Sequence, residues 1–143
     1  DPFAGMHRDY IPPPRSDATD ACPCGSGARF AACCGPLLAG AQHAATPEAL
    51  MRSRYSAYVL RDEAYLLATW HPETRPTELG LDREGALRWL GLKVKRHEDG
   101  GDGHAIVEFV ARYKVDGRGH RLHETSRFVR EQGLWRYLDG HCA

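Results

Sequence analysis

Hydrophobic residues recur at helical spacing in the stretch that follows Thr46. Thr46 supplies a hydroxyl that can cap a helix, and the proline and the acid that come next are typical of a first helical turn. The pattern predicts a helix of about fifteen residues. A second helix is predicted to follow Asp62 and to carry Tyr65 and Trp70. It should end at His71, because a residue before proline avoids helical backbone angles.

The hydrophobic period then changes to two, which predicts strands. In the first strand, Leu90, Leu92 and Val94 are expected on one face and Trp89 on the other. The Asp-Gly pair at Asp116 favours a hairpin turn between the second and third strands. The predicted strands cover 88–96, the residues from 105 to this turn, 119–130 and 134–139.

Along the last predicted strand, Trp135, Tyr137 and Asp139 occupy alternate positions and should share a face. Two helices followed by four mostly antiparallel strands predict an α+β domain, with the helices packed on one face of a curved sheet. The chain has 143 residues, which is enough for one domain, alone or with a small appendage.

The composition is that of a globular protein, with 42% hydrophobic and 27% charged residues. The 19 basic and 19 acidic residues balance, so no overall field would attract nucleic acid or an anionic membrane. No apolar run approaches the roughly 18 to 20 residues that cross a bilayer, and the first residues lack a secretory signal. We therefore expect a cytoplasmic protein without membrane contact. Nucleic-acid binding through the basic residues of the later strands is a minor alternative.

The first twenty residues are expected to lie outside the folded part. Residues 1–5 precede Met6 without a motif and are interpreted as the remnant of an expression tag. The stretch from 7 to 20 contains three consecutive prolines and little apolar material, which predicts an extended leader.

The main chemical signal is a group of cysteines: Cys22, Cys24, Cys33 and Cys34. A disulfide framework is disfavoured, because adjacent cysteines rarely reach disulfide geometry and a chain without an export signal stays reduced. A redox site would more naturally use two cysteines separated by two residues at a helix start. Four soft ligands in two pairs joined by a short loop suit a tetrahedral zinc ion.

The loop between the cysteine pairs also suits zinc. Its Gly-Ser-Gly at 25–27 permits tight turns whose amides can point at sulfur, and Arg29 can offset part of the thiolate charge. The stretch 22–35, CPCGSGARFAACCG, resembles the SEC-C motif, which is also found at the C-terminus of the SecA translocase motor. That resemblance implies a closed structural zinc site with these four cysteines as ligands, in a segment that serves protein contacts. Cys142 is expected to be a free thiol.

The wider chain is similar to the uncharacterised YchJ-like family. The resemblance rests on the cysteine motif and on stretches such as ALMRSRYSAYVLRDEAYLLATWHPETRP and LHETSRFVREQGLWRYLDG, and it covers nearly everything from 21 to 140. It implies a SEC-C zinc motif at 21–40 and a nuclear-transport-factor-2-like (cystatin-like) cone at 41–140, in which a bent sheet and helices enclose a pocket. No activity is established for the family.

Glu124 is the first candidate for chemistry inside the cone. It shares a strand face with Leu122 and Phe128, so it is expected to point toward the apolar, concave side of the sheet. A carboxylate there would have a raised pKa and could act as a general acid or base. The alternative is a salt bridge with Arg127 or Arg52.

Three further residues are candidates for the pocket. Arg52 could hold an anion and Tyr55 could donate a hydrogen bond from the first helix, while His71 could change charge near neutral pH. Each has a structural alternative, since a tyrosine on an apolar seam often fills the core and a histidine before proline often serves in capping or packing.

Two principal functions follow. In the favoured one, zinc organises a segment that binds a protein partner, and the cone binds a small ligand or a partner. The alternative is a small-molecule enzyme of the isomerase, dehydratase or hydrolase type that uses Glu124 as acid or base. The sequence contains no nucleophile elbow, phosphate loop or dinucleotide fingerprint.

Overall fold

The computed structural model describes residues 20–81 and 87–142. The predicted tag remnant and nearly all of the predicted leader lie outside these residues. The described chain begins with two short helices, η1 (Phe30–Ala32) and α1 (Gly35–Leu38), and continues with α2 (Pro47–Leu60) and α3 (Glu63–Ala68). The two short helices were not predicted from the sequence.

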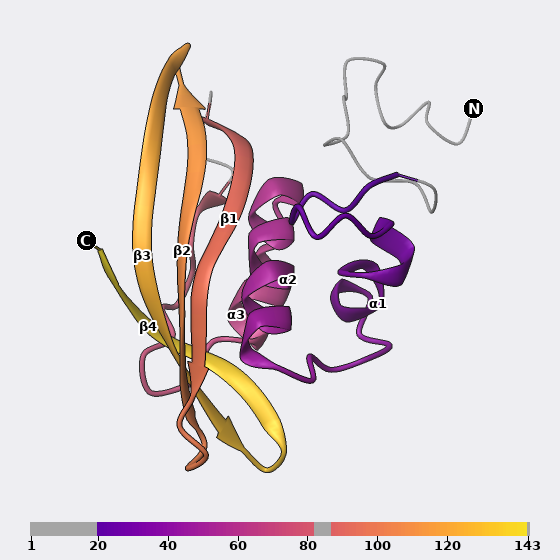
Figure 1. Ribbon diagram of the computed structural model, residues 1–143, viewed down its shortest axis with the longest axis vertical. Coiled ribbons are helices and arrows are strands. Elements are labelled where there is room, and N and C mark those ends of the chain that lie inside the picture. The colour runs from indigo at the N-terminus through magenta and orange to yellow at the C-terminus, as the bar shows by residue number, and fades with distance from the viewer. Residues whose placement is uncertain (1–19, 82–86, 143) are drawn as a thin grey trace.

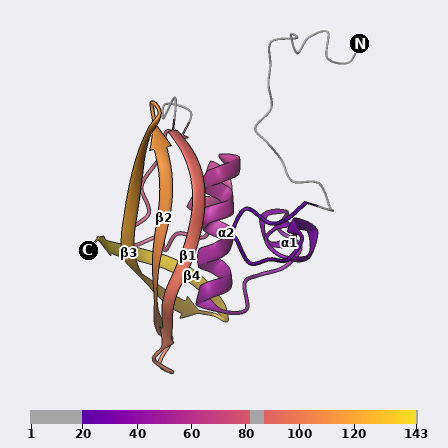
Figure 2. The same ribbon diagram turned by 45° about the horizontal axis from the view of Figure 1, so that its top comes forward.

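The second half of the chain forms a four-stranded antiparallel sheet in the order β1-β2-β3-β4. Its strands are β1 (Leu87–Asp99), β2 (His104–Val115), β3 (Arg118–Glu131) and β4 (Leu134–Cys142). The sheet is curved, and α2 lies against one face, which we call the inner face (Figure 1). Figure 2 shows the same arrangement after rotation, with α1 on the far side of α2 from the sheet. The predicted α+β class with helices on one face of a curved sheet is confirmed.

Both predicted helix caps form. The Thr46 hydroxyl accepts a hydrogen bond from the Ala49 amide at 3.0 Å, and the Asp62 carboxylate accepts one from the Tyr65 amide at 3.1 Å. The second helix ends at Ala68, earlier than predicted. The backbone beyond it pairs with β4 instead, because the Tyr137 amide and carbonyl bond the residues on either side of Trp70.

The prediction for the faces of the first strand was wrong at Trp89 and Leu90. A bulge between Trp89 and Gly91 shifts the register against β2. Because of it, Trp89 points inward against Tyr55 of α2, while Leu90 is 43% exposed on the outer face. Leu92 and Val94 pack against the core, as predicted.

A second bulge changes the predicted face of Asp139. The pairing of β3 with β4 shifts between Arg127 and Phe128, so Leu138 has no direct partner on β3. Tyr137 remains on the inner face. Asp139 instead bonds Arg127 on the outer face, with 2.6 Å between Oδ1 and Nε. Its expected inner position is taken by Gly140.

The main core lies between α2, the inner face of the sheet and the cysteine segment. Its buried apolar side chains come from α2, β2, β3 and β4, for example Leu50, Val107 and Phe128. Strand β1 adds partly buried side chains that pack against them. Cys22, Cys24 and Cys34 belong to the same buried cluster. The cysteine segment is therefore part of this core.

The bulge at Trp89 gives a testable difference between two leucines of one strand. Leu90→Thr should change the free energy of unfolding by less than about 0.5 kcal/mol, since the side chain is exposed and threonine suits a strand. Leu92→Thr should cost about 1–2 kcal/mol, because it removes apolar contacts with the core. Urea denaturation of both variants measures this, and equal costs would contradict the bulge.

Candidate metal centre and central cavity

The first cysteine pair lies on a tight loop. Ala21 and Arg29 form an isolated antiparallel bridge that closes it, and the Gly25 amide bonds the Cys22 carbonyl at 3.2 Å. Gly25 has a φ of 78°, a conformation that favours glycine. The loop thereby turns the side chains of Cys22 and Cys24 to one side.

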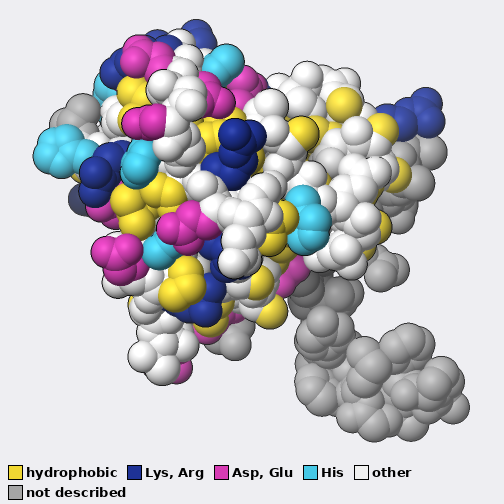
Figure 3. Space-filling view, turned by 90° about the horizontal axis from the view of Figure 1, so that it is seen from below, with side chains coloured by type: hydrophobic (Ala, Val, Ile, Leu, Met, Phe, Trp, Pro, Cys, Tyr) yellow, Lys and Arg dark blue, Asp and Glu magenta, His cyan; other side chains and the backbone are white. Residues whose placement is uncertain are grey.

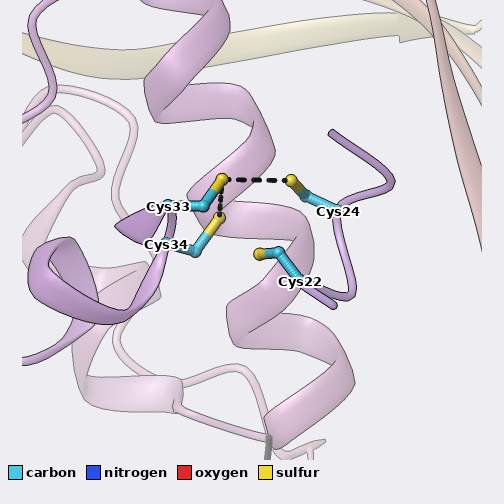
Figure 4. A group of neighbouring side chains, drawn as sticks. All are labelled: Cys22, Cys24, Cys33 and Cys34. Atoms are coloured by element: carbon cyan, nitrogen blue, oxygen red, sulfur yellow. Dashed lines mark hydrogen bonds between the residues drawn. The ribbon is translucent and has the colours of Figure 1, made fainter. Parts of the chain in front are cut away.

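The second pair follows η1. The Cys33 amide bonds the Phe30 carbonyl at 3.0 Å, and Cys34 is the N-cap of α1. The sulfurs of this pair point toward those of Cys22 and Cys24 (Figure 4). All four Sγ atoms lie within 4.8 Å of one another. The Cys24 and Cys33 sulfurs are 3.6 Å apart, and those of Cys33 and Cys34 are 3.9 Å apart.

This arrangement fits a tetrahedral metal site. Zinc–thiolate bonds of about 2.3 Å place the sulfurs of a tetrahedron about 3.8 Å from one another. The two measured separations, 3.6 and 3.9 Å, bracket that value. The predicted ligand set is therefore brought together at coordination distance. Cys142 is exposed at the end of β4 and is not part of this group.

The pKa values of Cys24, Cys33 and Cys34 are shifted in opposite directions. Hydrogen bonds from Cys22 and Cys34 hold the pKa of Cys24 far below its usual range. Hydrogen bonding to Cys22 and Cys24, together with burial, raises the pKa of Cys34, and burial raises the pKa of Cys33. One thiolate is thus stabilised at the expense of its neighbours. Four adjacent thiolates need a cation among them to offset their repulsion.

Helix α2 supplies polar contacts to the cysteines. Arg52 Nη1 donates to the Cys24 carbonyl at 2.8 Å and lies 4.0 Å from the Cys24 sulfur. Its Nε bonds Glu48 at 2.8 Å. One turn further along α2, the Ser56 hydroxyl lies 3.6 Å from the Cys22 sulfur. The structure therefore places Arg52 at the cysteine cluster, on the side of α2 away from the cone, and gives it the position that the sequence suggested for Arg29.

A cavity of about 310 Å³ lies between α2 and the inner face of the sheet. Its wall is mostly aromatic and aliphatic, which is typical of small-molecule sites. The lining residues are Met51, Arg54, Tyr55, Tyr58, Leu87, Trp89, Phe109, Ala111, Tyr113, Leu122, Glu124, Ser126, Phe128 and Tyr137. Two of the four candidate catalytic residues, Glu124 and Tyr55, line it.

Glu124 faces the cavity from β3, as its strand position predicted. Its Oε2 accepts a hydrogen bond from the Ser126 hydroxyl at 2.7 Å. Gly140 of β4 lies directly beneath, and a Cβ built there would be 2.0 Å from Oε2. The alternative salt bridge is not formed, because Arg127 bonds Asp139 and Arg52 bonds Glu48.

Arg54 is a cavity residue that the sequence reasoning missed. It is only 5% exposed, and its Nη1 donates to the Leu66 carbonyl at 2.8 Å and to the Thr69 hydroxyl at 2.7 Å. Its guanidinium carbon lies 4.3 Å from the Tyr137 ring centroid and 5.0 Å from that of Trp70. Burial lowers the pKa of Arg54. The signal in the sequence was a basic residue within the apolar seam of α2.

Two tyrosines of the cavity, Tyr55 and Tyr137, are neutral at physiological pH. Burial raises the pKa of Tyr55 to about 12 and raises the pKa of Tyr137 further, with the nearby charge of Glu124 adding to the latter shift. Tyr55 also packs edge-on against Trp89, with 5.7 Å between the ring centroids. Tyr55 therefore combines the packing role and the cavity position that the sequence left as alternatives.

His71 lies away from the cavity lining. Its Nε2 is 2.9 Å from a carboxylate oxygen of Glu131, and its Nδ1 accepts a hydrogen bond from the Glu73 amide at 3.1 Å. It is nearly buried. These contacts fix the turn after α3 against the end of β3, which matches the structural alternative for this residue.

The surface shows no concentration of one charge sign in the view of Figure 3, where basic, acidic and histidine side chains are interspersed. On the outer face of the sheet, Arg96 and His123 both bond Glu108, at 2.8 and 2.6 Å. Among the described residues, no helix has the length and apolar character needed to cross a bilayer.

Comparison with known proteins finds two family matches along the chain. Residues 19–36 match the SEC-C motif, and residues 46–140 match the family described as "YchJ, middle NTF2-like domain". The chain belongs to the YchJ family. A UPF0225 protein of Ralstonia nicotianae is 60% identical over 137 residues, which cover 89% of this chain and 94% of that protein. A UPF0225 protein of Chromobacterium violaceum is 57% identical, covering 90% and 98% of the two chains.

Two solved structures of SEC-C motif-containing proteins are also similar. The solution structure of one from Rhodopseudomonas palustris has a TM-score of 0.77 at 39% identity, and covers 85% of this chain and 98% of its own. The crystal structure of one from Psychrobacter arcticus has a TM-score of 0.74 at 29% identity, and covers 88% and 84%. The YchJ-like family and its fold, which the sequence suggested, are thus confirmed.

The contact between Arg52 and Cys24 predicts a role for this arginine in metal affinity. Arg52→Ala should weaken metal binding roughly 10- to 100-fold, because groups that orient metal ligands have effects of that size. The metal affinity of Arg52→Lys should fall between those of Arg52→Ala and the wild type. Competition with a chromophoric chelator measures the affinity.

Arg29→Ala is the matched control, since Arg29 is exposed at the mouth of the same loop. It should bind metal like the wild type. If Arg29→Ala loses more metal affinity than Arg52→Ala, then Arg29 is the arginine that offsets the thiolate charge, and the role inferred here for Arg52 is wrong.

Proposed function

We propose that this YchJ-family protein is a zinc-containing small-molecule-binding protein. Cys22, Cys24, Cys33 and Cys34 hold one Zn²⁺ as a closed structural site, and the cavity in the cone binds the ligand. Four thiolates, with sulfur separations of 3.6 and 3.9 Å, support zinc as the ion, because structural zinc sites are tetrahedral and rich in cysteine. When bound, the ion supplies charge neutralisation and cross-linking of the two cysteine pairs.

The observation that carries the binding function is the cavity itself. Its volume of about 310 Å³ is at the lower end of the usual range for ligand sites, about 300 to 1,000 Å³. Its wall is mostly aromatic and aliphatic, and Glu124, Ser126 and Arg54 add a few polar groups. A cone meant only to support the fold would gain stability from filling this space with side chains.

Helix α2 connects the two sites. Arg52 and Ser56 contact the cysteines, while Tyr55 and Tyr58 line the cavity. Zinc therefore acts on the binding function indirectly, by holding the segment that packs on the back of α2.

Acid or base chemistry is the second candidate function. It is favoured by one observation, the carboxylate of Glu124 in the cavity beside the neutral phenol of Tyr137. Chemical change of a cavity-bound compound that is lost in Glu124→Gln would support it. Release of every bound compound unchanged would favour binding alone.

Purified protein should contain one zinc per chain by elemental analysis. Cys24→Ser should lose nearly all of it and cost about 3 kcal/mol or more in the free energy of unfolding, because the thiols belong to the core. Cys142→Ser is the control, since that thiol is exposed, and should retain zinc and stability. Equal zinc contents in the two variants would refute the site.

Filling the cavity should abolish ligand binding. A fragment screen by saturation-transfer NMR is expected to find compounds that bind the wild type and fail to bind Leu122→Trp, whose new ring would occupy the cavity. Leu90→Trp adds the same ring on the exposed outer face and should bind as the wild type does. The binding function is wrong if no fragment distinguishes the two variants.

A further inference from the structure

We propose that the cavity binds a small, planar, uncharged ring compound that carries one N–H or O–H donor and gives that hydrogen bond to Glu124. This inference rests on the proposed binding function and specifies the class of ligand. It follows from three features of the cavity: its walls, the carboxylate of Glu124 and its balance of charge.

The walls select flat rings. Trp89 is the centre of an aromatic group, with its ring centroid 5.7 Å from that of Tyr55, 5.9 Å from Tyr58 and 5.3 Å from Tyr113. All four side chains line the cavity. Aromatic surfaces pack best against other rings, in offset or edge-to-face contacts. A planar ligand would gain such contacts, whereas a branched aliphatic one would not.

The register of the sheet separates these rings from the acid. Trp89 and Tyr113 pair with each other near the hairpin turn at Asp116. Glu124 pairs with Phe109, further from that turn along β2 and β3. The cavity therefore has an aromatic end and a polar end.

The polar end needs a donor. In the described part of the chain, the Glu124 carboxylate accepts one hydrogen bond, from Ser126, although a carboxylate can accept about four. Gly140 lies beneath it and brings no side chain that could donate. An acceptor facing an apolar cavity is stabilised by a ligand that donates to it.

The charges of the cavity favour an uncharged ligand. Arg54 and Glu124 line it together, one positive and one negative. The Nη1 of Arg54 is committed to Leu66 and Thr69, and its guanidinium carbon lies 4.3 Å from the Tyr137 ring centroid and 5.0 Å from that of Trp70. An anionic ligand would meet Glu124 without gaining that Nη1 as a donor, and a cationic ligand would meet the buried charge of Arg54. A neutral donor places no additional charge beside Arg54 or Glu124.

Four indole probes separate these requirements. Indole has the ring and the N–H donor, and 1-methylindole has the ring without the donor. Tryptamine adds a positive charge, and indole-3-carboxylate adds a negative one. Calorimetric or NMR titration of the zinc-loaded wild type should show indole binding at least tenfold more tightly than each of the other three.

Variants locate the donor contact. The preference is the ratio of the affinity for indole to the affinity for 1-methylindole. In Glu124→Leu, this ratio should fall to about one. Gly140→Ala should reduce that preference at least threefold, because its Cβ would lie 2.0 Å from Oε2 and would displace the carboxylate. Gly119→Ala is the control. A Cβ at Gly119 meets nothing within 4 Å, so the preference should remain.

The inference is overturned if 1-methylindole or a charged probe binds the wild type as tightly as indole, or if Glu124→Leu retains the preference. If indole does not bind, while other fragments bind the wild type and fail to bind Leu122→Trp, the ligand class is wrong and the binding function stands. If no compound binds the wild type at all, both are wrong.

Discussion

The packing of four thiols against one another inside the core is the interaction on which the structure depends. Cys22, Cys24 and Cys34 are buried in the same cluster as Leu50 and Phe128, so the sulfurs form part of the interior of the protein. Thiols at 3.6 to 3.9 Å are favourable as metal ligands and poorly matched as neighbours without an ion, since the pKa of Cys24 is lowered while those of Cys33 and Cys34 are raised. The fold of the N-terminal segment is thus coupled to metal binding.

Helix α2 transmits the effect of this centre to the rest of the molecule. Its residues Arg52 and Ser56 contact the cysteine segment, and Tyr55 packs against Trp89 of the sheet. The helix is therefore held from both sides, and its inward side chains form one wall of the cavity. This arrangement explains why a SEC-C segment, which could serve as a separate interaction module, is integrated into the sheet domain here. It also explains why Arg54 can be buried, because α3 and the rings around it replace the water it loses.

The amino-acid pattern was sufficient for the class of fold and for the grouping of the four cysteines, since period, caps and cysteine spacing are local properties. It placed Glu124 on the inner face, because strand alternation holds between the bulges of the sheet. It was wrong for Trp89, Leu90 and Asp139, where a bulge adds one residue and reverses the alternation. The position of Arg52 depended on which side of α2 the cysteine segment occupies. That is a tertiary property, and no local pattern in the sequence reports it.

X-ray absorption at the zinc edge of the purified protein tests the central claim most directly, because it reports the identity, number and distance of the atoms that bind the ion. The account predicts four sulfur atoms at about 2.3 Å and no nitrogen or oxygen ligand. A shell that contains nitrogen or oxygen, or fewer than four sulfurs, would contradict it, as would a protein that folds with all four thiols reduced and no metal.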